Sequence, residues 1–384
     1  MVADRVEWAV RAVPTGADLL TGETVVVNGE WRPTFTVPAS IAAGAGWVLR
    51  HRGVRDGAAT EAWRQVLLTL LGTPSVTALS GWAGANQHEG IRRDLTGTWM
   101  NRESWANLRD ANYINAPENG LPQWLALDPG NIDRAVDVGT PLIPHNGGSG
   151  GEHTTSGRSG WNALLDEAIS GAQDATYTSL GRRLAEYGPA TVFARLWWEM
   201  NQYPASIDAA KFRAAWARAV PLIRAGFAAA ARPGQHLFIV FCPMASLPGR
   251  WTMLPADLAH VDVLALDLYA ALWGRSIPTA AALLAYTGGM LTELADKGRE
   301  LGKPVALGEW GNWQTNAANT TTDDNHGRAD FPEFIDQVAD WADAPANNVR
   351  YLSYFDIAGG GVGITLNDTP LSRARLAARF APAP

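Results

Sequence analysis

Two glutamates in this chain of 384 residues directly follow apolar, strand-like runs. Glu199 lies in the segment Arg-Leu-Trp-Trp-Glu-Met-Asn, and Glu309 lies in the segment Gly-Glu-Trp-Gly. Hydrolysis of a glycosidic bond requires one carboxylic acid that protonates the leaving oxygen and a second carboxylate across the sugar ring. Taken alone, each glutamate is equally compatible with a salt bridge at the rim of a protein. Their interpretation depends on the elements that position them.

Eight short runs rich in β-branched and apolar residues predict strands. They cover residues 75–80, 111–115, 140–144, 190–196, 236–241, 261–266, 304–307 and 349–355. Helical patterns separate several of them, at residues 131–138, 162–186, 209–231, 280–301 and 330–343. This alternation favours parallel strands, and eight strands predict a (β/α)8 TIM barrel, an α/β fold, over residues 73–384. Functional groups of such barrels lie at the carboxyl ends of the strands, where both glutamates fall.

Residues 1–72 are predicted to form a separate small module with β-structure and one helix. Residues 24–27 and 31–37 flank an Asn-Gly pair, which is typical of a hairpin with a tight turn. Residues 60–71 carry apolar side chains at helical spacing and end before a glycine and a proline. We expect this module to be dispensable for chemistry, and it is a candidate for attachment to a particle or a cell surface.

The composition restricts the partners. Hydrophobic residues make up 47% of the chain and charged residues 18%, which is enough apolar material for a large core. The balance of 31 basic and 38 acidic residues gives a net charge of −7, the wrong sign for tracking a phosphate backbone. We therefore expect no nucleic-acid partner. No apolar run approaches the roughly 20 residues of a bilayer span, so we expect no membrane insertion.

No cofactor and no metal are predicted. Cys242 is the single cysteine, which excludes a disulfide within the chain and a cysteine-based zinc cluster. The histidines lack metal-binding spacing, and the three glycines at 359–361 lack the context of a phosphate loop. The first residues lack the apolar core of a secretory signal. The expected location is the cytoplasm or, for a phage-encoded protein, a virion.

The segment from Arg195 to Asn201 resembles the R-x-x-x-E-x-N signature that follows the fourth strand in clan A glycoside hydrolases. Residues 211–225, 261–269 and 303–311 are similar to segments of glycoside hydrolase family 26. The likeness covers roughly residues 75–357 and leaves out the N-terminal module. It implies a TIM barrel and a retaining glycosidase that cleaves a β-linked polysaccharide by double displacement.

Carried over residue by residue, the resemblance makes Glu199 the acid/base and Glu309 the nucleophile. Tyr269 would then hydrogen-bond the nucleophile. Arg195 and Asn201 would help to position the substrate or the catalytic carboxylates.

The resemblance implies three further site residues at strand ends. His145 and Asn146 would face the subsite beside the scissile bond, although His145 is equally compatible with a loop between glycines. Asp267 would be either a residue of the site or a hydrogen-bond acceptor behind it.

The 17 tryptophans are unusually many against 8 tyrosines and 10 phenylalanines. Trp82, Trp99, Trp105 and Trp313 lie in long segments after the first and seventh predicted strands, and they suit both stacking on sugar rings and anchoring of their loops. Trp310 follows Glu309 and is a candidate for the apolar wall that raises the pKa of the acid. We count Trp82, Trp310 and Trp313 among the substrate-binding residues.

Three positions depart from the family pattern and leave the sugar open. Trp198 stands where the family carries histidine, Gln202 where glycine is common and Met244 where asparagine is usual. The substrate is therefore mannan, glucan, xylan or a bacterial cell-wall polysaccharide such as an arabinogalactan. The alternative function is a non-catalytic carbohydrate-binding barrel, for example a phage tail or receptor-binding component. The presence of both glutamates argues against it.

Overall fold

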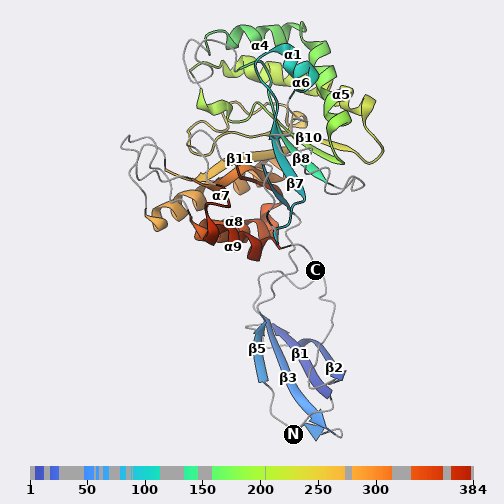
Figure 1. Cartoon of the computed structure of the whole chain (residues 1–384), viewed down its shortest axis with the longest axis vertical. Helices are drawn as coiled ribbons and strands as arrows, with labels where there is room; N and C mark the ends of the chain where they lie inside the picture. The colour runs from blue at the N-terminus through green and yellow to red at the C-terminus, as the bar shows by residue number, and fades with distance from the viewer. Residues whose placement is uncertain are drawn as a thin grey trace. The chain divides into compact units, whose positions relative to one another are not determined.

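The computed structural model divides into two compact units, residues 1–75 and residues 76–384 (Figure 1). In the first unit the structure describes the backbone of residues 5–12, 18–25, 47–55, 58–59 and 64–68. In the second unit it describes residues 78–83, 88, 90–112, 134–145, 158–203, 205–272, 279–313, 330–357 and 365–381. None of the described helices is both long enough and apolar enough to cross a membrane.

The first unit contains an antiparallel sheet in which β1 lies between β2 and β3, and both β4 and β5 pair with β3. The strands are β1 (Arg5–Ala12), β2 (Asp18–Val25), β3 (Trp47–Arg55), β4 (Ala58–Ala59) and β5 (Arg64–Leu68). The strand predicted at residues 24–27 overlaps the end of β2. The strand predicted at 31–37 and the turn before it lie outside the described residues.

The helix predicted over residues 60–71 is wrong. Residues 64–68 form β5, which runs antiparallel to β3 with Leu68 opposite Trp47 and Arg64 opposite His51. A short apolar run does not distinguish a helix from a strand by its spacing alone. Backbone pairing with β3, which begins 17 residues earlier in the chain, decides between them.

The second unit is a closed barrel of eight parallel strands, with β6 to β13 following one another around the barrel in chain order. This confirms the predicted (β/α)8 fold. The strands are β6 (Leu79–Ala83), β7 (Leu95–Trp99), β8 (Ala135–Thr140), β9 (Thr191–Leu196), β10 (His236–Phe241), β11 (Val263–Ala270), β12 (Val305–Asn312) and β13 (Val349–Phe355).

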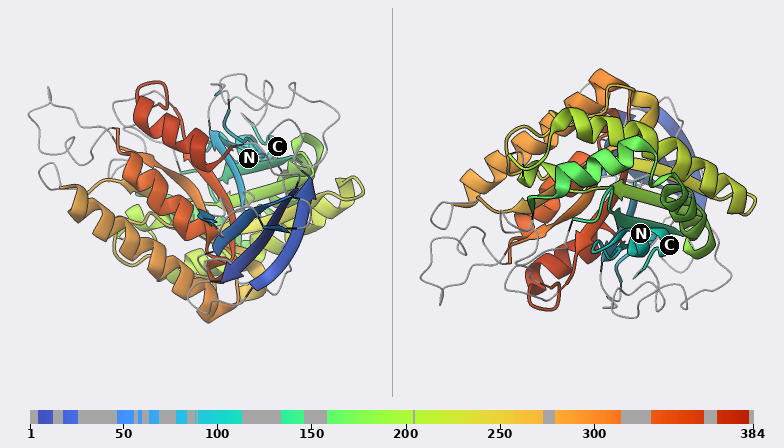
Figure 2. Two further views of the ribbon diagram at one scale, coloured as in Figure 1. Left: turned by 90° about the horizontal axis from the view of Figure 1, so that it is seen from below. Right: turned by 90° about the horizontal axis from the view of Figure 1, so that it is seen from above.

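Helices cover the outside of the strands (Figure 2). They are α1 (Trp105–Asp110), α4 (Trp161–Ser170), α5 (Asp174–Tyr187), α6 (Ala209–Ala230), α7 (Ala280–Leu301), α8 (Pro332–Asp343) and α9 (Pro370–Arg379). The single helix predicted at 162–186 is divided into α4 and α5 because the chain turns at Gly171, whose φ of 94° favours glycine. Short 3-10 helices lie at Met200–Gln202, Leu258–His260 and Pro345–Asn347.

The first three barrel strands lie away from their predicted positions. The second barrel strand is β7 and not the strand predicted at 111–115. Ala111 caps α1 in a left-handed conformation, and residues 113–115 lie outside the described residues. β7 reads Leu-Thr-Gly-Thr-Trp and has few large apolar residues, since its neighbours approach closely: a Cβ added at Gly97 would lie 2.9 Å from the Cβ of Ala83. The predicted helix at 131–138 is also wrong, since residues 135–138 belong to β8, while residues 131–133 lie outside the described residues.

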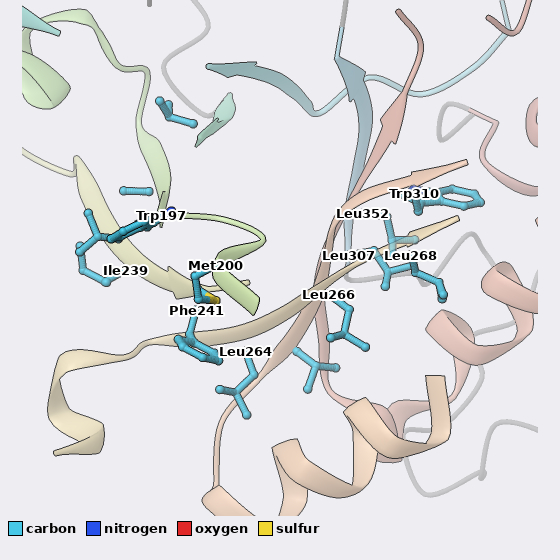
Figure 3. Close-up of a cluster of buried hydrophobic side chains, with 14 of the residues drawn as sticks. Trp197, Met200, Ile239, Phe241, Leu264, Leu266, Leu268, Leu307, Trp310 and Leu352 are labelled. Atoms are coloured by element: carbon cyan, nitrogen blue, oxygen red, sulfur yellow. The ribbon is translucent and has the colours of Figure 1, made fainter. Parts of the chain in front are cut away.

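Two hydrophobic cores hold the barrel together. The larger one lies between strands and helices and includes Leu264, Leu266 and Leu268 of β11 (Figure 3). The smaller one consists of inward-facing side chains such as Phe193 and Tyr351, whose rings stack with centroids 4.4 Å apart. Burying one such side chain contributes about 1.5–3 kcal/mol. Successive side chains of a strand point alternately to the outer and the inner core. Inward positions near the carboxyl ends of the strands are therefore available for polar groups.

Candidate active site

The structure brings the two glutamates together at the carboxyl ends of β9 and β12. One carboxylate oxygen from each of Glu199, Glu309 and Asp267 lies within 4.8 Å of the other two. Glu199 is half-buried, whereas Glu309 is 6% and Asp267 1% exposed. Three such oxygens can hold a cation in principle. Here the guanidinium of Arg195 already contacts two of the three carboxylates, so a further cation would lie beside a positive charge.

A β-bulge in β12 turns Glu309 into the barrel. The pairing of β12 with β11 skips one residue, Gly308, between Leu307 and Glu309. Leu307 and Trp310 both pack in the outer core. In a regular strand, side chains alternate between the two faces, so a single inward residue would separate two outward ones. Two residues separate Leu307 from Trp310, and the bulge places both of them, Gly308 and Glu309, on the inward side.

Glycine is required at the bulge because its neighbours leave no room. A Cβ added at Gly308 would lie 2.6 Å from Cδ of Arg195, 2.8 Å from Sγ of Cys242 and 2.9 Å from Oδ1 of Asp267. Two of these neighbours are charged groups of the site. Because Gly308 has no side chain, the side chain of Arg195 can approach the bulge and contact Glu309.

The chain leaves β9 through two residues with left-handed backbone. Trp197 has φ 49° and Glu199 has φ 55°, which is uncommon for residues other than glycine. Hydrogen bonds hold both: the Trp197 N–H donates to the Thr140 carbonyl (2.6 Å), and the Glu199 N–H donates to the Cys242 carbonyl (2.7 Å). Such strained residues are concentrated at functional sites, and here the strain aims Glu199 at Glu309.

Asn201 fastens the segment that carries Glu199. Its side-chain amide donates to the Met244 carbonyl (3.0 Å) and accepts from the Met244 N–H (2.8 Å). Both polar ends of the Asn201 side chain are used by the backbone after β10, and the residue is 3% exposed. The structure therefore places Asn201 in a positioning contact.

Glu309 accepts three hydrogen bonds from side chains. The hydroxyl of Tyr269 donates to Oε2 (2.7 Å), while Nη1 of Arg195 (2.8 Å) and the indole N–H of Trp99 (3.0 Å) both donate to Oε1. Tyr269 thus bonds the glutamate that the family resemblance pairs it with, and Arg195 contacts one of the two glutamates. The contact of Trp99 was missed, because no sequence signal separates it from the other loop tryptophans.

Arg195 is the central cation of the site and is fully buried. Besides Glu309 it contacts Asp137 through Nε (3.0 Å) and Asp267 through Nη1 (3.2 Å). Burial raises the pKa of Asp137 to about 7 against the attraction of Arg195. Burial, followed by repulsion from Glu309, raises the pKa of Asp267 well above its usual range. One guanidinium therefore serves three carboxyl groups, and burial raises the pKa of two of them, Asp137 and Asp267.

Asp137 was not recognised from the sequence. It lies in β8 within the segment predicted as a helix, and it accepts a hydrogen bond from the Tyr351 hydroxyl (3.2 Å) as well as from Arg195. An aspartate in the middle of an apolar strand was the available signal, because such a residue is rarely fully buried unless it is paired.

Replacing Arg195 with methionine is expected to destabilise the fold by about 3–5 kcal/mol at neutral pH, because buried carboxylates lose their partner. The loss should grow with pH. The pKa of Asp137 in the folded chain is about 7, above its unfolded value of about 4, and removal of Arg195 raises it further. An acid with a raised folded pKa loses stability as the pH rises through this window. Urea unfolding at about pH 5 and about pH 8 measures this dependence.

Arg218→Met is the matched control. Arg218 pairs with Asp174 at 2.7 Å, but their side chains are 40% and 39% exposed, so its loss should cost much less stability than the loss of Arg195. Equal losses for the two variants would contradict the central role of Arg195 in the stability of the site.

Trp198 and Gln202 flank Glu199 in the sequence. The side-chain amide of Gln202 donates to Oε2 of Glu199. The ring of Trp198 belongs to the inner core, and the guanidinium of Arg102 lies 5.0 Å from its centroid. Gln202, one of the departures from the family pattern, thus contacts Glu199 directly.

Aromatic rings surround Glu309 on the side of Tyr269. The centroid of Tyr269 lies 4.9 Å from that of Trp313 and 5.9 Å from that of Phe355, and Trp99 lies 5.8 Å from Phe355. Trp99 and Phe355 are half-buried, whereas Trp313 is 9% exposed. Trp313 is therefore brought close to the glutamates, as a substrate-binding residue would need to be.

Two other predicted residues lie in packed surroundings. Trp310 is 1% exposed and contacts Phe334 of α8 in the outer core (Figure 3). Trp82 is 2% exposed, with the guanidinium of Arg93 at 4.4 Å from its ring centroid. The structure gives both rings core contacts and does not bring Trp310 into the barrel with Glu309.

His145 is also buried. It is 2% exposed, stacks on Trp197 with centroids 5.2 Å apart, and bonds the Ile143 carbonyl through Nδ1 (3.0 Å). Burial lowers the pKa of His145 well below its usual range, and the positive charge of Arg102 lowers it further. A neutral histidine thus packs behind the segment of Glu199. Asn146 lies outside the described residues.

The structure of this chain is similar to known protein structures. No protein-family model matches the chain, and no curated protein matches it in sequence. GH26C from a Muricauda species is 13% identical, covers 81% of this chain and 92% of its own, and gives a TM-score of 0.53. An engineered protein is 16% identical, with coverages of 80% and 70% and a TM-score of 0.50.

An endo-beta-1,4-mannanase double mutant from Cellulomonas fimi is 17% identical, covers 80% of this chain and 72% of its own, and gives a TM-score of 0.46. At such identities the first two comparisons establish the fold alone. The fold is a TIM barrel like that of a glycoside hydrolase family 26 protein, in agreement with the resemblance found in the sequence.

Proposed function

We propose that this chain is a retaining glycoside hydrolase that cleaves a β-linked polysaccharide. The separation of the two glutamates carries the proposal. Retaining enzymes hold their carboxyl groups about 5–5.5 Å apart, whereas inverting enzymes leave about 6.5–9.5 Å for a water molecule. One carboxylate oxygen of Glu199 and one of Glu309 lie within 4.8 Å of each other, which favours the shorter separation of a retaining enzyme.

The surroundings divide the two roles. Glu309 accepts hydrogen bonds from Arg195, Tyr269 and Trp99, and these three donors hold its carboxyl group in one orientation. It is therefore the nucleophile. In the first step Glu309 attacks the anomeric carbon while Glu199 gives its proton to the departing glycosidic oxygen. In the second step Glu199 takes a proton from water, the water oxygen bonds to the anomeric carbon, and Glu309 leaves as a carboxylate.

The aromatic rings of Trp313 and Phe355 support a sugar substrate, because sugar rings stack on apolar faces. The sugar itself stays open among mannan, glucan, xylan and arabinogalactan. Attachment through the N-terminal unit stays a prediction as well.

A panel of these four polysaccharides tests the proposal. New reducing ends should appear with at least one polymer, and proton NMR of the first product should show the β-anomer before mutarotation. A Glu199→Gln/Glu309→Gln double variant is the control for contaminating activity. Formation of the α-anomer would overturn the retaining mechanism. Binding of a polymer without cleavage would favour the alternative of a non-catalytic carbohydrate-binding barrel.

A further inference from the structure

The donors on Glu309 are distributed unequally between its two oxygens. Oε1 accepts from both Arg195 (2.8 Å) and Trp99 (3.0 Å), whereas Oε2 accepts from Tyr269 (2.7 Å). A carboxylate oxygen has about two lone-pair sites. Among the described residues, Oε1 thus has both of its sites filled and Oε2 has one site left.

Packing fixes the direction of the Trp99 indole. Trp99 is the last residue of β7, and its ring meets Phe355 edge-on at an interplanar angle of 68°. Its other side lies against β8, where a Cβ added at Gly139 would be 2.4 Å from Cδ1 of Trp99. A glycine in β8 therefore makes room for the ring, and the ring is held with its N–H toward Glu309.

We propose that Trp99 is a positioning residue that, together with Arg195, closes Oε1 of Glu309 and so selects Oε2 as the attacking oxygen. The inference rests on the proposed function of Glu309. During the first step Oε2 forms the bond to the anomeric carbon, and Oε1 becomes the carbonyl oxygen of the resulting ester. During the second step the carbon–Oε2 bond breaks, its electron pair goes to the carboxylate, and negative charge returns to Oε1.

This arrangement has a kinetic consequence. A hydrogen bond is stronger to a carboxylate than to an ester carbonyl. The Trp99 N–H therefore stabilises the free Glu309 relative to the glycosyl-enzyme, and it assists the second step, in which the carboxylate leaves. Removing the donor should slow breakdown of the intermediate more than its formation.

Trp99→Phe tests the inference because it keeps an aromatic ring against Phe355 and removes the donor. With the dinitrophenyl glycoside of the sugar that the native chain releases, kcat should fall about 10-fold or more, the size expected for a lost bond to a charged group. The value of kcat/KM should change little, and the glycosyl-enzyme should accumulate in intact-protein mass spectra.

Trp105→Phe is the matched control, because the Trp105 indole donates to Glu167 on the surface at 2.9 Å. This variant should keep the native kcat and show no accumulated intermediate. A Trp99→Phe enzyme with native kcat, or with equal loss of kcat and kcat/KM and no accumulation, would overturn the inference.

An NMR measurement on the full chain needs no turnover. In protein labelled with 15N-tryptophan, the indole resonance of Trp99, identified by its loss in Trp99→Phe, should move upfield in Glu309→Gln, while that of Trp105 stays in place. An unmoved Trp99 resonance would overturn the inference. Absence of hydrolysis by the native chain would instead overturn the proposed function, and the resonance shift distinguishes the two failures.

Discussion

Replacing Glu309 with alanine is expected to reduce turnover on the order of 10⁴-fold or more, the scale of losing a covalent nucleophile. The residue lies 6% exposed at the bulge of β12, with Tyr269 and Arg195 bonded to opposite oxygens. The neighbouring Asp267 is not expected to replace it, because Arg195 and Cys242 hold its carboxyl group in place. The kcat measured with the cleaved polysaccharide gives the loss directly.

External azide should restore part of the Glu309→Ala activity, because it fits the space of the lost carboxylate. The product would be a glycosyl azide of inverted configuration, detectable by NMR. The control is Glu293→Ala, which removes a carboxylate of α7 that pairs with Arg250 at 2.6 Å and should leave kcat near the native value. A Glu309→Ala variant that is active without azide would refute the assignment of the nucleophile.

Replacing Glu199 with alanine should slow cleavage of the natural polymer about 10²–10⁴-fold, the usual contribution of a general acid. Substrates with activated leaving groups need no protonation of the departing oxygen, so they should lose far less in the first step. The comparison of kcat/KM for a natural oligosaccharide and for its dinitrophenyl glycoside measures the difference.

Gln202→Leu is the control variant for Glu199→Ala. Gln202 donates to Glu199, so its replacement removes a partner of the acid but keeps the proton donor. Its loss of activity should be smaller and should depend less on the leaving group. Equal slowing of both substrates by Glu199→Ala would refute the acid role.

Local sequence pattern predicted much of the barrel. The strands at 236–241 and 349–355 and the helix at 280–301 were predicted at the bounds that the structure shows. These segments have strong periodicity and clear ends, since their pattern repeats the contacts of one strand or helix with the apolar core. The position of both glutamates near the carboxyl ends of strands followed from the same pattern.

Contacts between distant segments decided the elements that were predicted wrongly. β5 is a strand because β3 pairs with it, and β7 has few large apolar residues because its neighbours leave little room around Gly97. Neither the pairing partner nor the available space is encoded in the spacing of apolar residues within a single segment. Prediction from local pattern therefore fails where packing between strands, rather than apolar periodicity within one segment, determines the secondary structure.

The chemistry of the site depended most on tertiary structure. From Leu307 onward, strict alternation would place Glu309 outside the barrel, and the bulge at Gly308 turns it inward. The Trp99 indole reaches Glu309 across 210 residues of sequence. The sequence alone determines which carboxylates stand at strand ends. Their approach to within 4.8 Å and their hydrogen-bond donors arise only when the barrel closes, because closure sets the register between strands far apart in the chain.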